Sequence, residues 1–79
     1  MQVRVLFFGA TADAVGDSEV TLDIGSEATL GDLVQFLKTS NARLAQMKLL
    51  SAVNEEYAET RRTLMAGDRV ALFTAVSGG

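Results

Sequence analysis

Apolar and polar residues alternate along residues 19–24, where Val20, Leu22 and Ile24 share one face and acidic or hydroxyl side chains occupy the other. This two-residue period predicts a half-buried strand. Residues 2–8 are instead apolar on both faces, which is typical of a strand in the middle of a sheet or one covered on both sides. The two segments are close enough in the sequence to pair as a hairpin.

After this hairpin the period changes to that of a helix. The residues at positions i, i+3, i+4 and i+7 form one apolar stripe: Leu30, Leu33, Val34 and Leu37. Thr29 comes just before the stripe and is a good N-cap residue. Asp32 lies three residues after Thr29, which is close to the capping-box pattern. Phe36 lies beside the stripe, and we expect it to widen the buried face.

The remaining segments predict two short helical turns, at residues 9–16 and 42–47, and strands at residues 49–53 and 69–76, with a further short strand after the turn at residues 54–56. The order is therefore strand, strand, helix, strand, short strand, strand. A hairpin, one helix and a long last strand predict an α+β roll.

This arrangement is the β-grasp, or ubiquitin-like, fold: a mixed sheet with one main helix packed on one face. The length of 79 residues fits one domain, which we place at residues 1–76, followed by a C-terminal tail at residues 77–79. The expected core is Val5, Val20, Leu22, Leu33, Leu37, Val70 and Leu72.

The last strand presents two apolar faces. Val70 and Leu72 share one face, and Ala71 and Phe73 share the other. Only one face can meet the single helix. If Val70 and Leu72 enter the core, Phe73 points outward beside the tail, and with Tyr57 it becomes an anchor for a protein partner. The alternative is that a short loop covers Phe73.

Composition excludes several classes of site. The chain has no cysteine and no histidine, so it lacks a thiol nucleophile, a redox couple and the commonest metal ligand. Glu55 and Glu56 fall in the predicted turn, where a solvated pair is the usual case, and Asp13, Asp17 and Glu19 lack metal-ligand spacing. We expect no bound cofactor, no metal and no catalysis by this chain alone.

Net charge and hydropathy limit the partners and the cellular location that we expect. The net charge of −3 argues against a nucleic-acid partner. No apolar run approaches the roughly 20 residues that span a bilayer, and residues 1–5 run directly into a strand pattern without a signal peptide. We expect no membrane association and a cytoplasmic location.

The chemistry that remains lies at the C-terminus. Gly78 and Gly79 have no side chains, so they can pass through a narrow channel in a partner. The four residues from Val76 to the end reach at most about 13–14 Å. A free carboxylate is a poor electrophile, but adenylation by ATP converts it to a reactive anhydride. A sulfur nucleophile can then turn this anhydride into a thiocarboxylate.

Three segments are similar to one known family: "VLFFG" at residues 5–9, "LLSAVNEEY" at residues 49–57 and "LMAGDRVALFTAVSGG" at residues 64–79. They resemble the family of molybdopterin synthase small subunits, which are ubiquitin-like sulfur carriers of the MoaD type. The likeness extends over nearly the whole chain. Its most specific part is Gly-Asp, an apolar strand and a final Val-Ser-Gly-Gly.

The resemblance implies a sequence of reactions at Gly79. A ubiquitin-activating-type adenylyltransferase adenylates Gly79 with ATP, and a sulfur donor protein supplies the sulfur of the thiocarboxylate. Val76, Ser77 and Gly78 then carry the charged end into the large synthase subunit, in an expected heterotetramer. There the sulfur passes to cyclic pyranopterin monophosphate and becomes part of the molybdopterin dithiolene.

One departure and three alternatives remain. Such tails often read Phe-Pro-Pro-Val, whereas this chain reads Phe-Thr-Ala-Val at residues 73–76, so its exit segment is less stiff. A sulfur carrier for thiazole and thiamine synthesis shares the fold and ending. A ubiquitin-like modifier would join Gly79 to target lysines. A plain interaction domain would make no use of its Gly-Gly end.

Overall fold

The structure, a computed structural model, describes residues 1–75. The elements along the chain are β1 (Gln2–Phe7), α1 (Ala10–Val15), β2 (Glu19–Asp23), α2 (Leu30–Ser40), α3 (Ala42–Ala45), β3 (Leu49–Val53), β4 (Glu56–Tyr57) and β5 (Arg69–Thr74). The predicted order of strands and helices is confirmed. The predicted last strand was too long, since β5 ends at Thr74, and Val76 lies outside the described residues.

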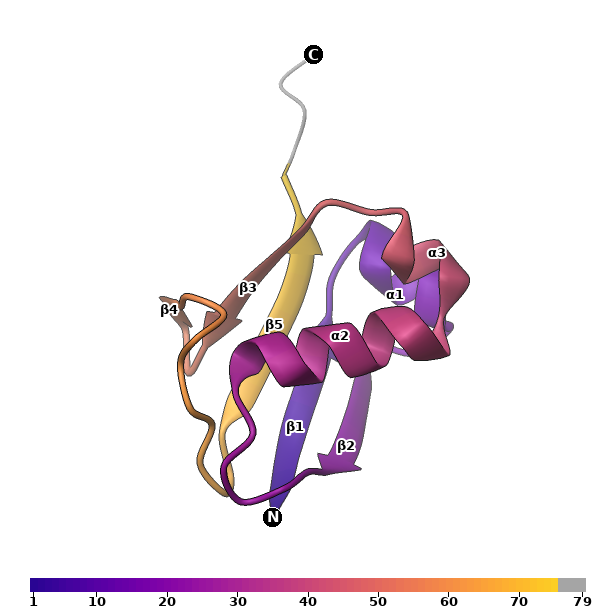
Figure 1. The fold of residues 1–79 in the computed structure, drawn as a ribbon. Coiled ribbons are helices and arrows are strands. Elements are labelled where there is room, and N and C mark those ends of the chain that lie inside the picture. Colours follow the sequence, from indigo (N-terminus) through magenta and orange to yellow (C-terminus); the bar gives the residue numbers. More distant parts are fainter. Residues whose placement is uncertain (76–79) are drawn as a thin grey trace.

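All five strands form one mixed sheet in the order β2-β1-β5-β3-β4. β5 occupies the centre, parallel to β1 and antiparallel to β3, and the β1–β2 and β3–β4 pairs are antiparallel. Figure 1 shows α2 lying across one face of this sheet, with α1 and α3 together at one end. The α+β roll of β-grasp type is therefore confirmed. Within residues 1–75, no helix has the length and apolar character needed to cross a membrane.

The hydrophobic core fills the space between the sheet and the helices. Its buried members are Val3, Val5, Phe7, Leu30, Leu33, Leu37, Leu44, Val53, Leu64, Val70 and Leu72. Five predicted core residues, Val5, Leu33, Leu37, Val70 and Leu72, are among them. Val5 pairs with Val70 across β1 and β5, and Leu72 pairs with the next core residue of β1. The two central strands therefore supply adjacent rows of the core.

Two predicted core residues, Val20 and Leu22, are only partly buried, although they pack against the core. The reason is the position of β2 at the edge of the sheet, where β1 is its one neighbouring strand within residues 1–75. Alternation along a strand identifies the apolar face, but the depth of burial depends on what lies beside the strand.

Helix α2 begins as its sequence predicts. The Thr29 hydroxyl accepts a hydrogen bond from the Asp32 backbone nitrogen at 3.2 Å, and the Asp32 carboxylate accepts one from the Thr29 nitrogen at 2.9 Å. This reciprocal pair is a complete capping box. Phe36 does not widen the buried stripe: it is 55% exposed, which corrects the expectation. The predicted stripe itself packs on the core: Leu30, Leu33 and Leu37 are buried, and Val34 is partly buried against them.

Candidate functional site

The C-terminal strand is held firmly at the end from which the tail leaves. Phe8 follows the last residue of β1, and its backbone nitrogen donates a hydrogen bond to the Leu72 carbonyl at 3.1 Å. The Thr11 hydroxyl oxygen lies 3.0 Å from the same carbonyl and 2.8 Å from that of Phe8. Thr11 is fully buried. The start of α1 therefore replaces β1 as the neighbour that holds β5 in place.

No pattern in the sequence predicted a role for Thr11. It sits in a six-residue helix bounded by glycines, and its only distinctive feature is a hydroxyl among small residues. The helix itself was predicted, but the bond to Leu72 joins residues 61 positions apart. No local pattern reports such a pairing.

The other end of β5 is fixed by a polar network around Asn54. The Asn54 nitrogen donates to the Arg69 carbonyl at 2.8 Å, and the Arg69 nitrogen donates to the Asn54 side-chain oxygen at 3.0 Å. The Asn54 amide also donates to Asp68 at 3.0 Å, and the Met65 nitrogen donates to the second Asp68 oxygen at 2.8 Å. Asp68 is buried. With both ends tied, the base of the tail has a fixed position relative to the sheet.

The sheet face opposite α2 carries an apolar patch beside the end of β5. We define the patch by six residues: Leu6, Leu50, Ala52, Tyr57, Ala71 and Phe73. Strand pairing brings them together, since Leu6 and Ala52 each lie opposite Ala71, and Leu50 lies opposite Phe73. All except Tyr57 are of intermediate exposure.

Phe73 and Tyr57 meet directly in this patch. Their ring centroids are 6.0 Å apart with an interplanar angle of 62°, an edge-to-face arrangement. Tyr57 is 81% exposed, whereas Phe73 is half-buried. The structure thus places both sequence-predicted partner residues on the face away from α2, next to the strand that leads to the tail. Their role in partner binding stays a prediction.

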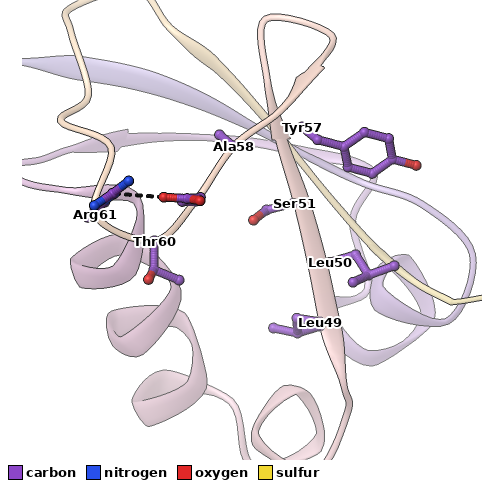
Figure 2. Close-up of a pocket in the computed structure, with 8 residues that line it drawn as sticks. Leu49, Leu50, Ser51, Tyr57, Ala58, Thr60 and Arg61 are labelled. Carbon is purple, nitrogen blue, oxygen red and sulfur yellow. Dashed lines mark ion pairs between the residues drawn. The ribbon is translucent and has the colours of Figure 1, made fainter.

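A shallow depression of about 640 Å³ adjoins the patch and shares Leu50 and Tyr57 with it. Figure 2 shows Leu50 and Tyr57 on one side of β3, with Leu49 and Ser51 on the other. The far wall is the segment of residues 58–61, where Arg61 forms an ion pair with Glu59 at 2.7 Å. Both charged side chains are largely exposed, and Figure 2 shows this wall on the Leu49 and Ser51 side of β3, away from Leu50 and Tyr57.

The residues predicted to insert into the partner, Val76, Ser77 and Gly78, and the predicted reactive residue Gly79 lie outside the described residues. The boundary between domain and tail at residues 76 and 77 therefore stays a prediction as well. Among residues 1–75, no group of three or more His, Cys, Asp or Glu is arranged to hold a metal ion.

Two curated proteins match the chain over essentially its full length. The molybdopterin synthase sulfur carrier subunit of Chlamydomonas reinhardtii is 34% identical over 83 positions and covers 100% of both chains. The subunit of the same name from Homo sapiens is 30% identical over 83 positions, covering 99% of this chain and 94% of its own.

Solved structures share the fold and, in part, the sequence. SAMP1 from Haloferax volcanii, also described as small archaeal modifier protein 1, is 27% identical with a TM-score of 0.88 and full coverage of both chains. In the complex of subunits 1 and 2 of molybdopterin-converting factor from Helicobacter pylori, one chain is 22% identical with a TM-score of 0.72 and full coverage of both chains. Residues 5–79 match the ThiS family. On this match and the two full-length relatives, the chain belongs to the ThiS family.

Proposed function

We propose that this protein is the sulfur carrier subunit of a molybdopterin synthase and that Gly79 is the residue that carries the sulfur. The observation that supports this best is the family match, which extends to the Gly-Gly end itself. Both full-length relatives are named as sulfur carrier subunits of that synthase. The chain has no cysteine, so a thiocarboxylate at the C-terminus is the form in which it can hold transferable sulfur.

The charging reaction has two steps. In the first, a Gly79 carboxylate oxygen attacks the α-phosphorus of ATP on an adenylyltransferase, and pyrophosphate leaves. In the second, a hydrosulfide equivalent attacks the acyl carbon, AMP leaves with the bridging oxygen, and a thiocarboxylate and a proton remain. The charged end then donates its sulfur to cyclic pyranopterin monophosphate in the large subunit, and two charged carriers complete one dithiolene.

Geometry explains why a folded carrier suits these steps. The four residues that follow Ala75 reach at most about 13–14 Å when extended, which is enough to bring the terminal carbon into a partner's active site while the domain stays outside. A misplacement of about 1 Å can cost roughly 100-fold in rate. The fixed base of the tail, tied through Thr11 and Asn54, gives that reach a defined starting point.

The test of charging compares three chains that differ in the length of the tail. Wild type, a variant lacking Gly79 and a variant with one alanine added after Gly79 are incubated with the adenylyltransferase, ATP and sulfide. Intact-protein mass spectrometry should find one oxygen replaced by sulfur in wild type and no replacement in either variant. Deletion withdraws the carboxylate by about 3.3–3.6 Å, and addition converts the Gly79 carboxylate to an amide. Normal charging of the extended variant would contradict the proposal.

We further propose that the large synthase subunit binds the apolar patch, with Phe73 and Tyr57 as anchors. Aromatic residues that are accessible within an apolar patch are frequent anchors of such an interface. Phe73→Ala should weaken the complex by about 2 kcal/mol or more, as measured by titration calorimetry, and should change the stability of the isolated domain less. Phe36→Ala is the matched control, because that ring is exposed on α2, away from the patch. Equal affinity for the two variants would refute the assignment.

A second candidate function is protein modification through Gly79. The observation in its favour is the 27% identity to SAMP1, which is described as a modifier protein. This function predicts isopeptide-linked adducts in cells, detected by digestion and mass spectrometry as Gly79-derived remnants on target lysines. A molybdopterin carrier predicts a free thiocarboxylate and no such adducts. A carrier for thiazole synthesis would be charged in the same way but would pass its sulfur to a thiazole synthase.

A further inference from the structure

Strand β2 forms one edge of the sheet and presents unused backbone groups there. Met1 and Ile24 exchange two hydrogen bonds, with Ile24 donating at 2.8 Å and the Met1 nitrogen donating at 2.9 Å. In an antiparallel ladder, hydrogen-bonded pairs alternate with non-bonded pairs. The β1–β2 register continues directly from the Met1–Ile24 pair, running from Gln2 opposite Asp23 to Leu6 opposite Glu19. The backbone N–H and C=O groups of Glu19, Thr21 and Asp23 therefore point away from β1.

The two carboxylates of this edge are turned toward β1, although their side chains stay partly exposed, Glu19 at 40% and Asp23 at 79%. The Glu19 carboxylate accepts two hydrogen bonds from the Arg4 guanidinium, both at 2.9 Å, and the Asp23 carboxylate lies 3.1 Å from the Met1 ammonium. Both cationic groups belong to residues on the β1 side. Edge strands usually resist pairing through free charged side chains, prolines or bulges. Here both carboxylates are directed toward β1.

An apolar groove follows the same edge between β2 and α2. It consists of two cavities of about 260 and 310 Å³, and both are lined by Leu22 and Phe36. The apolar residues that line one or both are Phe7, Val15, Val20, Leu22, Ile24, Ala28, Leu33, Phe36, Leu37 and Leu44. Phe36 lines both cavities and is 55% exposed, so its ring lies at the mouth of the groove.

The shape and charge of the groove indicate its occupant. Each cavity is at or below the low end of the range for small-molecule pockets, about 300–1,000 Å³, so it suits single side chains better than a whole cofactor. Two acidic residues, Asp23 and Asp32, are among the lining residues, and no Lys or Arg is among them in the described part of the chain. A second copy of this chain fits poorly, because symmetric pairing about Thr21 would set Glu19 opposite Asp23, a like-charge pair.

We propose that this groove binds an extended peptide of another protein, which adds as a strand to the edge of β2. Its backbone pairs with Glu19, Thr21 and Asp23, and its alternate side chains, which are aliphatic, enter the groove. A basic side chain lies at the end formed by Asp23 and Asp32. The groove is on the α2 side of the sheet and shares no residue with the apolar patch, so the peptide and the synthase partner can bind together.

The probes are two synthetic peptides, acetyl-Lys-Val-Thr-Ile-Thr-Val-amide and acetyl-Val-Thr-Ile-Thr-Val-Lys-amide. Each is titrated into the ¹⁵N-labelled full chain and followed by NMR. One of them should shift the amide signals of β2 and of Phe36 and slow hydrogen exchange at Glu19, Thr21 and Asp23. The signals of Phe73 and Leu50 should not move. The peptide that binds gives the direction of the added strand.

Thr21→Pro tests the backbone pairing directly. It removes an N–H that points away from β1, a position where edge strands tolerate proline, and it should weaken binding about tenfold or more. Thr21→Val keeps that N–H and should bind like wild type. Phe36→Ala, an exposed position, gives a second test if Thr21→Pro does not fold, and it should also weaken binding.

Three results would overturn the proposal. The first is the absence of shifts in β2 with either peptide. The second is unchanged affinity in both Thr21→Pro and Phe36→Ala. The third is protection of Thr21 that rises with protein concentration in the absence of peptide, which would make a second copy the occupant. None of these results depends on charging of Gly79, so a failure here leaves the proposed function untouched.

Discussion

Replacing Thr11 with valine would test how the base of the tail is held. The side chain is fully buried, and valine has nearly the same shape but no hydroxyl. The change removes the contact of 3.0 Å to the Leu72 carbonyl, that of 2.8 Å to the Phe8 carbonyl, and the hydrogen bond of 3.0 Å that the hydroxyl oxygen accepts from the Phe8 nitrogen. It leaves the direct bond from the Phe8 nitrogen to Leu72 in place at 3.1 Å.

The remaining bonds set the size of the effect. The Phe8 carbonyl still accepts from the Thr11 nitrogen at 3.2 Å, so each of the former partners keeps one hydrogen bond. The cost should therefore lie near that of a net hydrogen bond, about 1–1.5 kcal/mol, and below the roughly 3 kcal/mol of a fully unsatisfied buried group. For a domain of this size, such a loss lowers Tm by about 4–12 °C.

Chemical denaturation gives the free energy of unfolding, and native-state hydrogen exchange reports the local opening. Thr11→Val should speed exchange of the Phe8 amide, whereas Thr11→Ser, which keeps the hydroxyl but loses a methyl group, should leave that amide protected. Both variants lose stability, so the Phe8 amide is the discriminating measurement. If Thr11→Val unfolds at the wild-type midpoint and leaves Phe8 protected, the hydroxyl does not hold β5.

Two further predictions concern packing and the hairpin turn. Leu37→Ala, at a core position that is 7% exposed, should cost about 2–5 kcal/mol in a denaturant titration, and a cost near zero would contradict burial of the α2 stripe. Glu55 has a φ of 72° next to Asn54 at 52°, so Glu55→Gly should relieve strain and stabilise by about 0.5–1 kcal/mol. Asn54→Gly should instead destabilise, since it loses the bonds to Arg69 and Asp68, and a gain in Tm there would refute the turn analysis.

The sequence by itself determined most of the local structure. The capping box at Thr29 and Asp32, the stripe of α2 and the alternation of β2 depend on residues within a few positions of each other. Propensity and periodicity act over that range. The sequence also indicated the family, because the Gly-Gly end and the strand before it are contiguous. The partner role of Phe73 and Tyr57 and the chemistry of Gly79 stay predictions.

Only the tertiary structure decided what lies beside each element. The alternation of β2 predicted Val20 and Leu22 as core residues, but the strand lies at the sheet edge, which leaves them partly exposed. Phe36 adjoins the buried stripe in sequence yet faces the open groove beside β2. Thr11 helps to hold β5 because its hydroxyl contacts the carbonyl of Leu72, which is 61 residues away in the sequence. A periodic pattern specifies which face of an element is apolar, whereas strand order and long-range contacts determine what covers that face.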